Sequence, residues 1–326
     1  MQSTGPLKVL ITSAAGRVGK ELVAHLLKAN KDIFIRACCR SDRGGFLKAL
    51  GAHEVIKMDY MDPSTFEGVL DGVNVVFSSS PDPCLKGHKQ FMELVASRKD
   101  QIKHIVRLSC FGAEQNTASY EMDTHVSQKG AEIPLMMKGY WWGEEACINT
   151  GIPTTVLRAN FFMGHLLKTE MENIMSKGFF RCPLGETRNS FVSTNDVGEA
   201  ASVTIQEGAE RHGNKFYDIT GPAPQNMHEV AADLAAVLEK PVEYKAQDLD
   251  EFEKDFGKIR REFFEYLNNG FYTRVSPSFY NLTGHKPTSW REHLTKKGAA
   301  GETGVEDLHM AGVWKKGVDI MKDAEH

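Results

Sequence analysis

The strongest chemical signal in the chain is a loop of small residues near the N-terminus. Ser13-Ala14-Ala15-Gly16-Arg17-Val18-Gly19 follows a run of apolar β-formers and precedes an amphipathic segment. A glycine at position 16 lets the backbone approach a phosphate, and one at position 19 lets a helix pack closely on a strand. The N–H groups at the start of that helix attract anions. The loop therefore predicts a pyrophosphate site, although Ser13 replaces the first glycine of a Gly-x-x-Gly-x-x-Gly pattern.

The end of the second expected strand distinguishes between two dinucleotides. An NAD site commonly has an acidic residue there, about 20 residues past the loop, which binds the ribose hydroxyls. This chain instead has Arg40, with Ser41 and Arg43 close by and no acid before Asp42. A guanidinium can stack on adenine and pair with a 2′-phosphate. These residues favour NADP(H) over NAD(H); the alternative is that Arg40 is a solvated loop residue.

Other polar residues follow the third and fourth expected strands. Asp59 and Tyr60 lie in a turn that borders the adenine ring in such folds, and Ser79 and Ser80 come after the next strand. The alternative for the turn is a helix cap, since Asp62-Pro63 is a typical helix start, and both roles can hold. From these signals the expected cofactor residues are Thr12, Ser13, Ala15, Gly16, Arg17, Val18, Gly19, Arg40, Ser41, Arg43, Asp59, Tyr60, Ser79 and Ser80.

These residues must be positioned by a regular alternation of strands and helices. Apolar β-rich runs predict strands over 7–12, 33–39, 54–58, 73–78, 103–109 and 154–158. Helical spacing of apolar residues predicts helices over 17–29, 46–50, 66–70, 86–98 and 141–149. This order indicates an α/β fold with a Rossmann-type, doubly wound parallel sheet.

Beyond residue 160 the alternation weakens. Helices are expected over 163–176, 196–207, 226–239 and 250–268, with short strands over 215–220 and 242–245. We therefore expect residues 1–162 to form the NAD(P)-binding core, completed by parts of 190–222. Residues 163–326 should form mainly a smaller C-terminal substrate lobe, with an extension of unassigned role from about residue 295.

The bulk composition excludes several classes of protein. The 326 residues carry a net charge of −4, with basic and acidic residues interleaved, so we expect no nucleic-acid partner. The six cysteines form no Cys-x-x-Cys pair and have no histidine at ligand spacing, so no metal site is expected. The start of the chain resembles neither a secretory signal nor a membrane span. We expect a cytoplasmic protein without a membrane contact.

Several segments together resemble a known family. The most specific is GIPTTVLRANFFM over 151–163; the loop, Arg40, Asp59-Tyr60, Ser109 and Glu145 agree with it, as do FVSTNDVGEAA, FYDITGP and LTGHKPTSWREHL. This set resembles the NmrA-like and triphenylmethane reductase-like group of atypical short-chain dehydrogenase/reductases, over about residues 7–294. The resemblance implies NADP(H) in a cleft between a Rossmann domain and a small lobe. It adds Ser109, Asn160, Phe161 and Phe162 to the expected cofactor residues.

The usual proton-transfer pair of short-chain enzymes is missing. In that pair, Tyr-x-x-x-Lys, the tyrosine is the general acid and the lysine lowers its pKa. None of the eight tyrosines has a lysine four residues on. Tyr140 could donate the proton and Lys138 could touch the ribose, although both could equally pack the start of a helix. His125, in a long loop, is a weaker candidate proton donor, because a lone loop histidine is usually just exposed.

These features favour an NADPH-dependent reductase that transfers hydride to a small acceptor such as a quinone, an imine or iminium, or an enone. Such acceptors need only modest acid assistance, and aromatic residues near the expected cleft suit a flat hydrophobic molecule. The alternative is a redox sensor or regulatory protein that binds NADP(H) without turnover. An epimerase is disfavoured because its chemistry needs the missing pair. The sequence leaves open whether the chain is a monomer or a homodimer.

Overall fold

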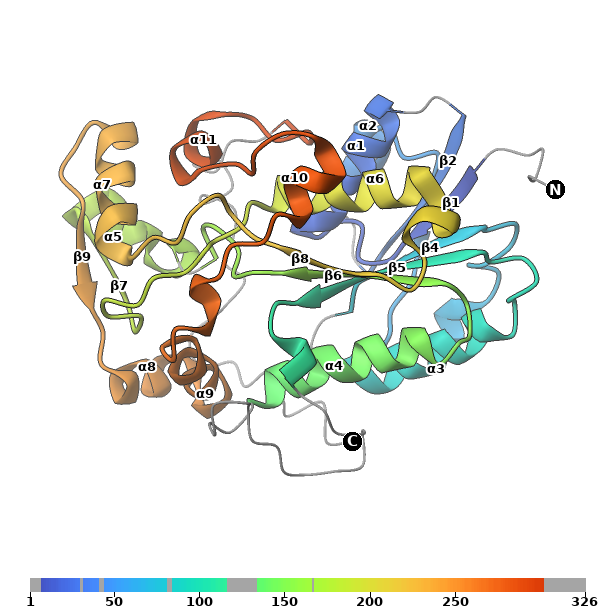
Figure 1. Cartoon of the computed structure of the whole chain (residues 1–326), viewed down its shortest axis with the longest axis horizontal. Coiled ribbons are helices and arrows are strands. Elements are labelled where there is room, and N and C mark those ends of the chain that lie inside the picture. The colour runs from blue at the N-terminus through green and yellow to red at the C-terminus, as the bar shows by residue number, and fades with distance from the viewer. Residues whose placement is uncertain are drawn as a thin grey trace.

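The central sheet has seven strands, all parallel, in the order β3-β2-β1-β4-β5-β6-β8 (Figure 1). The computed structural model describes residues 7–29, 32–40, 44–80, 84–115, 134–165 and 167–301. The strands are β1 (Leu7–Ile11), β2 (Ile33–Cys39), β3 (Glu54–Lys57), β4 (Val75–Ser78), β5 (His104–Cys110), β6 (Thr154–Ala159) and β8 (Phe216–Ile219). The predicted α/β, Rossmann-type doubly wound sheet is confirmed.

Helices cover both faces of this sheet (Figure 1). One face carries α1 (Arg17–Ala29) and α6 (Thr194–His212), which pack against each other over a core of β-branched and leucine side chains. The short α2 (Gly44–Leu50) lies beside α1. The other face carries α3 (Leu85–Ala96) and α4 (Leu135–Ile148), which enclose a second core. Burial of both faces explains why the strands are near-continuous apolar runs.

The second part of the chain, from about residue 163 to residue 301, packs around an aromatic core. A two-stranded parallel sheet pairs β7 (Phe179–Cys182) with β9 (Glu243–Ala246). The helices there are α5 (Met171–Lys177), α7 (Met227–Leu238), α8 (Leu249–Phe256), α9 (Lys258–Leu267) and α11 (Trp290–Thr295), while α10 (Ser278–Thr283) packs on α6 and β8. The division of the chain into a cofactor core and a substrate lobe remains a prediction.

Several elements differ from those expected. The helix expected over 163–176 begins only at Met171, after a 3-10 turn over Leu167–Glu170. A helix over 66–70 was wrong: a 3-10 turn over Pro63–Phe66 occupies the region, and the Asp62 side chain caps it by accepting from Ser64 N–H. The single helix over 250–268 was also wrong, because Gly257 has a φ of 86° and separates α8 from α9. β7 was not expected at all, since its four residues give too short a pattern.

All six cysteines are buried, and none of them forms a disulfide. Within the described ranges, no group of three or more His, Cys, Asp or Glu side chains is arranged to hold a metal ion. None of the helices in these ranges has the length and apolar character needed to span a bilayer.

Candidate functional site

The turn between β1 and α1 has the backbone that a phosphate-binding loop requires. Ser13 has a positive φ of 51°, so the serine adopts the left-handed conformation that glycine usually supplies. Gly16 N–H then donates to the Ser13 carbonyl at 2.8 Å, which closes the turn. Ala14 N–H donates to the Cys38 carbonyl at 2.9 Å and so ties the loop to β2.

The two glycines of the loop leave no room for a side chain at position 19 and little room at position 16. A Cβ on Gly19 would lie 2.6 Å from the Ser13 carbonyl oxygen and 2.7 Å from Ala14 Cα. A Cβ on Gly16 would lie 3.0 Å from the same carbonyl oxygen. Gly19 therefore serves close helix packing, and Gly16 leaves its exposed backbone open to a ligand at the start of α1. This cradle fits the pyrophosphate of a dinucleotide.

Hydroxyl groups join the loop to the end of β4. Ser79 N–H donates to Thr12 Oγ1 at 2.8 Å, and the Ser13 hydroxyl donates to the Ser79 carbonyl at 3.0 Å. The carboxyl ends of β1, β2 and β4 are aligned here, because Ile11 pairs with both Ala37 and Phe77. Thr12, Ser13 and Ser79 thus lie together at the sheet edge where ligands of such folds bind.

A buried arginine beneath this edge was missed by the sequence reasoning. Arg107, on β5, is 1% exposed, and its Nη1 donates to Ser80 Oγ at 3.0 Å and to Ser78 Oγ at 3.4 Å. No carboxylate of the described residues lies within ion-pair distance of it. Buried cations are usually paired, so the described part of the chain places an arginine without a carboxylate partner next to Ser80. An arginine in the middle of an apolar strand was the available signal.

The residues expected to bind the adenine end of the cofactor differ in how far they are buried. Arg40 lies exposed at the end of β2, where the sequence analysis puts the 2′-phosphate. Asp59 is half-buried, and its carboxylate accepts from Met61 N–H at 3.0 Å. Tyr60 is buried against the edges of Phe66 and Phe91, and burial raises the pKa of its phenol well above the usual range. Ser41, Arg43 and His125 lie outside the described residues.

The segment after β6 is held rigidly at the opposite end of the site. The Asn160 side chain accepts from Phe161 N–H at 2.6 Å and donates to the Tyr272 carbonyl at 3.2 Å. The His165 ring stacks on Phe161 with ring centroids 5.6 Å apart. Burial lowers the pKa of His165 well below its usual range, and Arg17 lowers it further, so the ring is neutral at pH 7. His165 was not among the sequence candidates.

The aromatic residues near this segment form core more than an open wall. Phe161 and Phe180 are buried in the aromatic core of the second part of the chain. Phe179 is covered by the Lys245 ammonium, 4.2 Å from its ring centroid. Phe162 remains half-buried beside His165.

Ser109 points away from the loop and into a buried ion pair. Its hydroxyl donates to Glu144 Oε1 at 2.5 Å, and Arg158 Nη2 donates to Glu144 Oε2 at 2.8 Å. Glu144 is fully buried, and its hydrogen bonds and charge outweigh burial and raise the pKa of Arg158 above its ordinary value. Glu144 stands four residues after Tyr140, where the usual proton-transfer pair has lysine. The network joins α4 to β5 and β6.

The candidate proton donors that the structure describes lie on α4. Tyr140 is half-buried against the aromatic core, and Lys138 is 7% exposed. On the same side of the sheet, the Tyr272 hydroxyl donates to the Phe111 carbonyl at 2.6 Å and so anchors the second part of the chain to the end of β5. The assignment of Tyr140 and Lys138 to catalysis stays a prediction.

Comparisons with known proteins agree with this fold. The model of the NmrA-like family matches residues 7–272. Prestalk A differentiation protein A of Dictyostelium discoideum is 27% identical over 301 residues, which cover 88% of this chain and 91% of that protein. The NAD(P)H azoreductase of Xenophilus azovorans is 27% identical over 245 residues, covering 74% and 78%.

One solved structure that superposes well is the NADPH-dependent quinone oxidoreductase QOR2 of Escherichia coli, complexed with NADPH. Its TM-score is 0.70 at 21% identity, and the match covers 87% of this chain and 97% of that one. The likeness supports the same fold.

Proposed function

This chain belongs to the NmrA-like family, and we propose that it is an NADPH-dependent reductase acting on a small, planar, hydrophobic acceptor. The observation that carries the proposal is the loop from Ser13 to Gly19. Its left-handed serine, the crowded Gly19 and the exposed Gly16 form a phosphate cradle at the start of α1. The arginine at position 40 supports a 2′-phosphate in place of a free ribose hydroxyl.

The residues of the chain divide the work of binding and orientation. Gly16 and the start of α1 would hold the pyrophosphate, and Ser79 and Ser80 would border it from the end of β4. The Asn160 amide, fixed between Phe161 and Tyr272, would hold the segment beside the nicotinamide. NADPH, when bound, supplies the hydride, and positioning accounts for much of the rate in such reactions.

The proposed acceptor class follows from the absence of the usual Tyr-x-x-x-Lys pair for proton transfer. With glutamate in place of the lysine, the Tyr140 hydroxyl has no ammonium four residues on to lower its pKa. A quinone, imine or iminium, or enone needs less acid assistance than a simple carbonyl. Two similar proteins, an azoreductase and a quinone oxidoreductase, support acceptors of this kind.

The experiment is NADPH oxidation followed by absorbance with a panel of quinones, imines and enones. We expect at least one class to be reduced, with one acceptor reduced per NADPH consumed. If NADPH binds and no acceptor is reduced, the reductase proposal fails.

A second candidate is a regulatory protein that binds NADP(H) without turnover. It is favoured by the similarity to a protein named for its part in differentiation and by the missing Tyr-x-x-x-Lys. It predicts tight NADPH binding with no consumption in the same panel.

A further inference from the structure

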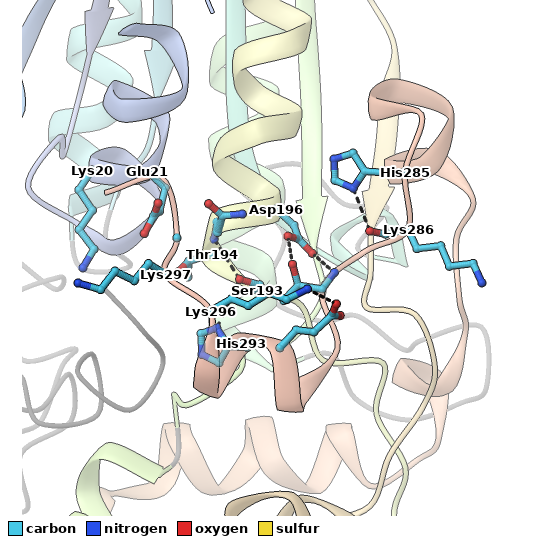
Figure 2. Close-up of a pocket in the computed structure, with 14 residues that line it drawn as sticks. Lys20, Glu21, Ser193, Thr194, Asp196, His285, Lys286, His293, Lys296 and Lys297 are labelled. Atoms are coloured by element: carbon cyan, nitrogen blue, oxygen red, sulfur yellow. Dashed lines mark hydrogen bonds and ion pairs between the residues drawn. The ribbon is translucent and has the colours of Figure 1, made fainter. Parts of the chain in front are cut away.

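A polar cavity of about 240 Å³ lies between α1, the start of α6 and the C-terminal segment 285–298 (Figure 2). None of its lining residues belongs to the loop or strand ends proposed above to hold NADPH. Its volume equals that of about eight water molecules in the liquid, which is too small for a dinucleotide and large enough for a compact polar molecule.

The three carboxylates that line the cavity are already used to hold the C-terminal segment. Each accepts a hydrogen bond from residues 288–300. Four lysines line the cavity beside these three carboxylates, so positive charge exceeds negative charge in its lining. The pairs are Glu21 with Ala300 N–H at 2.8 Å, Asp196 with Thr288 N–H at 2.7 Å, and Glu292 with Lys296 Nζ at 2.6 Å.

Two lysines give the cavity a cationic end. In Figure 2 the side chains of Lys20 and Lys297 extend toward the same end of the cavity. Lys297 makes no hydrogen bond or ion pair with any other residue in the described part of the chain, and Lys20 is only 7% exposed. Lys20 and Lys297 place two positive charges at this end of the cavity, and positive charge attracts an anion.

The start of α6 adds donors on the same cavity. This helix has 19 residues, and Ser193 caps it by accepting from Asn195 N–H at 3.2 Å. Thr194, the first residue of the helix, is 8% exposed and lines the cavity. Its hydroxyl has no hydrogen-bond partner among the described residues. Because this hydroxyl lies beside a helix N-terminus, it leaves a donor for an anion held in the cavity.

We propose that this cavity binds a phosphate group, either as inorganic phosphate or as a small phosphomonoester. The tetrahedral oxygens would accept from the Thr194 hydroxyl and the start of α6, and Lys20 and Lys297 would balance the charge. Lysine acts on phosphate as a point charge, so the flexible Lys297 can serve from the exposed rim.

The test is calorimetric titration of the full chain with inorganic phosphate, at constant ionic strength set with chloride. Thr194→Val removes the hydroxyl and leaves the Ser193 cap, and Lys297→Gln removes an exposed charge. We expect each to weaken phosphate binding at least about fivefold, the size of one lost hydrogen bond. Lys99→Gln, an exposed lysine outside the cavity, is the charge-matched control and should leave the affinity unchanged.

Repeating the titration with glycerol 3-phosphate distinguishes the two sources. Tighter binding of the ester identifies a phosphomonoester site, and binding of inorganic phosphate alone identifies an ion site. Saturating NADPH should not displace either ligand. The titrations of the wild type and its variants without NADPH test the phosphate site even if the chain does not bind NADPH. No phosphate binding, or equal affinity in the wild type, Thr194→Val and Lys297→Gln, overturns the proposal.

Discussion

Ser13 shows how a single residue can depart from a phosphate-loop pattern without destroying the loop. A left-handed conformation costs a non-glycine residue about 1–2 kcal/mol. The Ser13 hydroxyl bond to the Ser79 carbonyl, at 3.0 Å, offsets part of that cost and links the loop to β4. The departure therefore keeps the backbone that Gly16 needs.

Arg40 carries the prediction of cofactor preference. Arg40→Ala should weaken NADPH binding about 10- to 100-fold, because a hydrogen bond to a charged group contributes about 1.5–3 kcal/mol. NADH, which has no 2′-phosphate, should lose little. Fluorescence titration of both cofactors measures this, with Arg98→Ala, another exposed arginine, as the control. Equal losses of affinity for NADPH and NADH would contradict a contact between Arg40 and the 2′-phosphate.

Tyr140 carries the prediction of proton transfer. Tyr140→Phe should lower kcat by about tenfold. This is less than the 10²- to 10⁴-fold that general acid catalysis usually contributes, because the proposed acceptors need only modest acid assistance. The dissociation constant of NADPH should stay within about twofold, since packing is retained. Steady-state kinetics with the best acceptor gives the first and titration the second. Tyr280→Phe, at an exposed tyrosine, is the control. An unchanged kcat in Tyr140→Phe would show that Tyr140 only packs against its neighbours.

The sequence predicted that the loop, Arg40 and Ser79 follow strands, as they follow β1, β2 and β4, and their part in cofactor binding stays a prediction. It did not indicate the role of Glu144. Which of two adjacent glutamates is buried depends on the helical phase, and that phase depends on where α4 begins. The pattern placed the start near Trp141, whereas the helix begins at Leu135. Glu144 makes a bidentate contact with Arg158 on β6, and the spacing of apolar residues along the sequence cannot predict such a tertiary contact.

At the scale of elements, the packing of α3 against the turn after β3 depends on one glycine. A Cβ on Gly87 would lie only 1.7 Å from the Tyr60 carbonyl oxygen, whereas a Cβ on Gly139 in α4 would meet nothing within 4 Å. The two glycines are therefore a matched pair of helical sites, one crowded and one open.

Gly87→Ala should lower the free energy of unfolding by about 1–3 kcal/mol or more, because the helix must move away from the turn. Gly139→Ala should raise it by up to about 1 kcal/mol through helix propensity. Equilibrium urea unfolding measures both. Equal stability of the two variants would contradict this helix packing.

Element types were predicted well where the pattern was long, as in β2 and α1, whose bounds agree with the expected ones. They failed where a local backbone event overrides periodicity. Gly257 breaks a continuous amphipathic pattern because its φ of 86° is outside the helical region. The pairing of β7 with β9 joins segments more than sixty residues apart, which no local signal shows.

At the scale of the whole molecule, Asp196 joins the C-terminal segment to the start of α6. Its carboxylate accepts from Thr288 N–H at 2.7 Å, and burial raises its pKa to about 6 despite those bonds. The folded state then binds a proton more tightly than the unfolded state, whose aspartate has a pKa of about 3.9. Stability from this group is present at low pH and is lost as the pH rises from about 4 through 6.

Asp196→Asn removes this titration. Relative to the variant, the wild type should lose at most about 3 kcal/mol of unfolding free energy between pH 4 and pH 7, from about two pKa units at 1.36 kcal/mol each. Urea unfolding of both proteins across this range measures the difference, with Asp71→Asn, at an exposed aspartate, as the control. A difference that does not change with pH would show that folding does not shift the pKa of Asp196.

The claim that joins these scales is that the turn from Ser13 to Gly19 and Arg40 form an NADPH site. Calorimetric titration of the purified chain with NADPH and with NADH tests it most directly. We predict one NADPH bound per chain, and an affinity for NADH at least about tenfold lower, the equivalent of about 1.4 kcal/mol. No binding of either dinucleotide, or equal affinity for both, would contradict it.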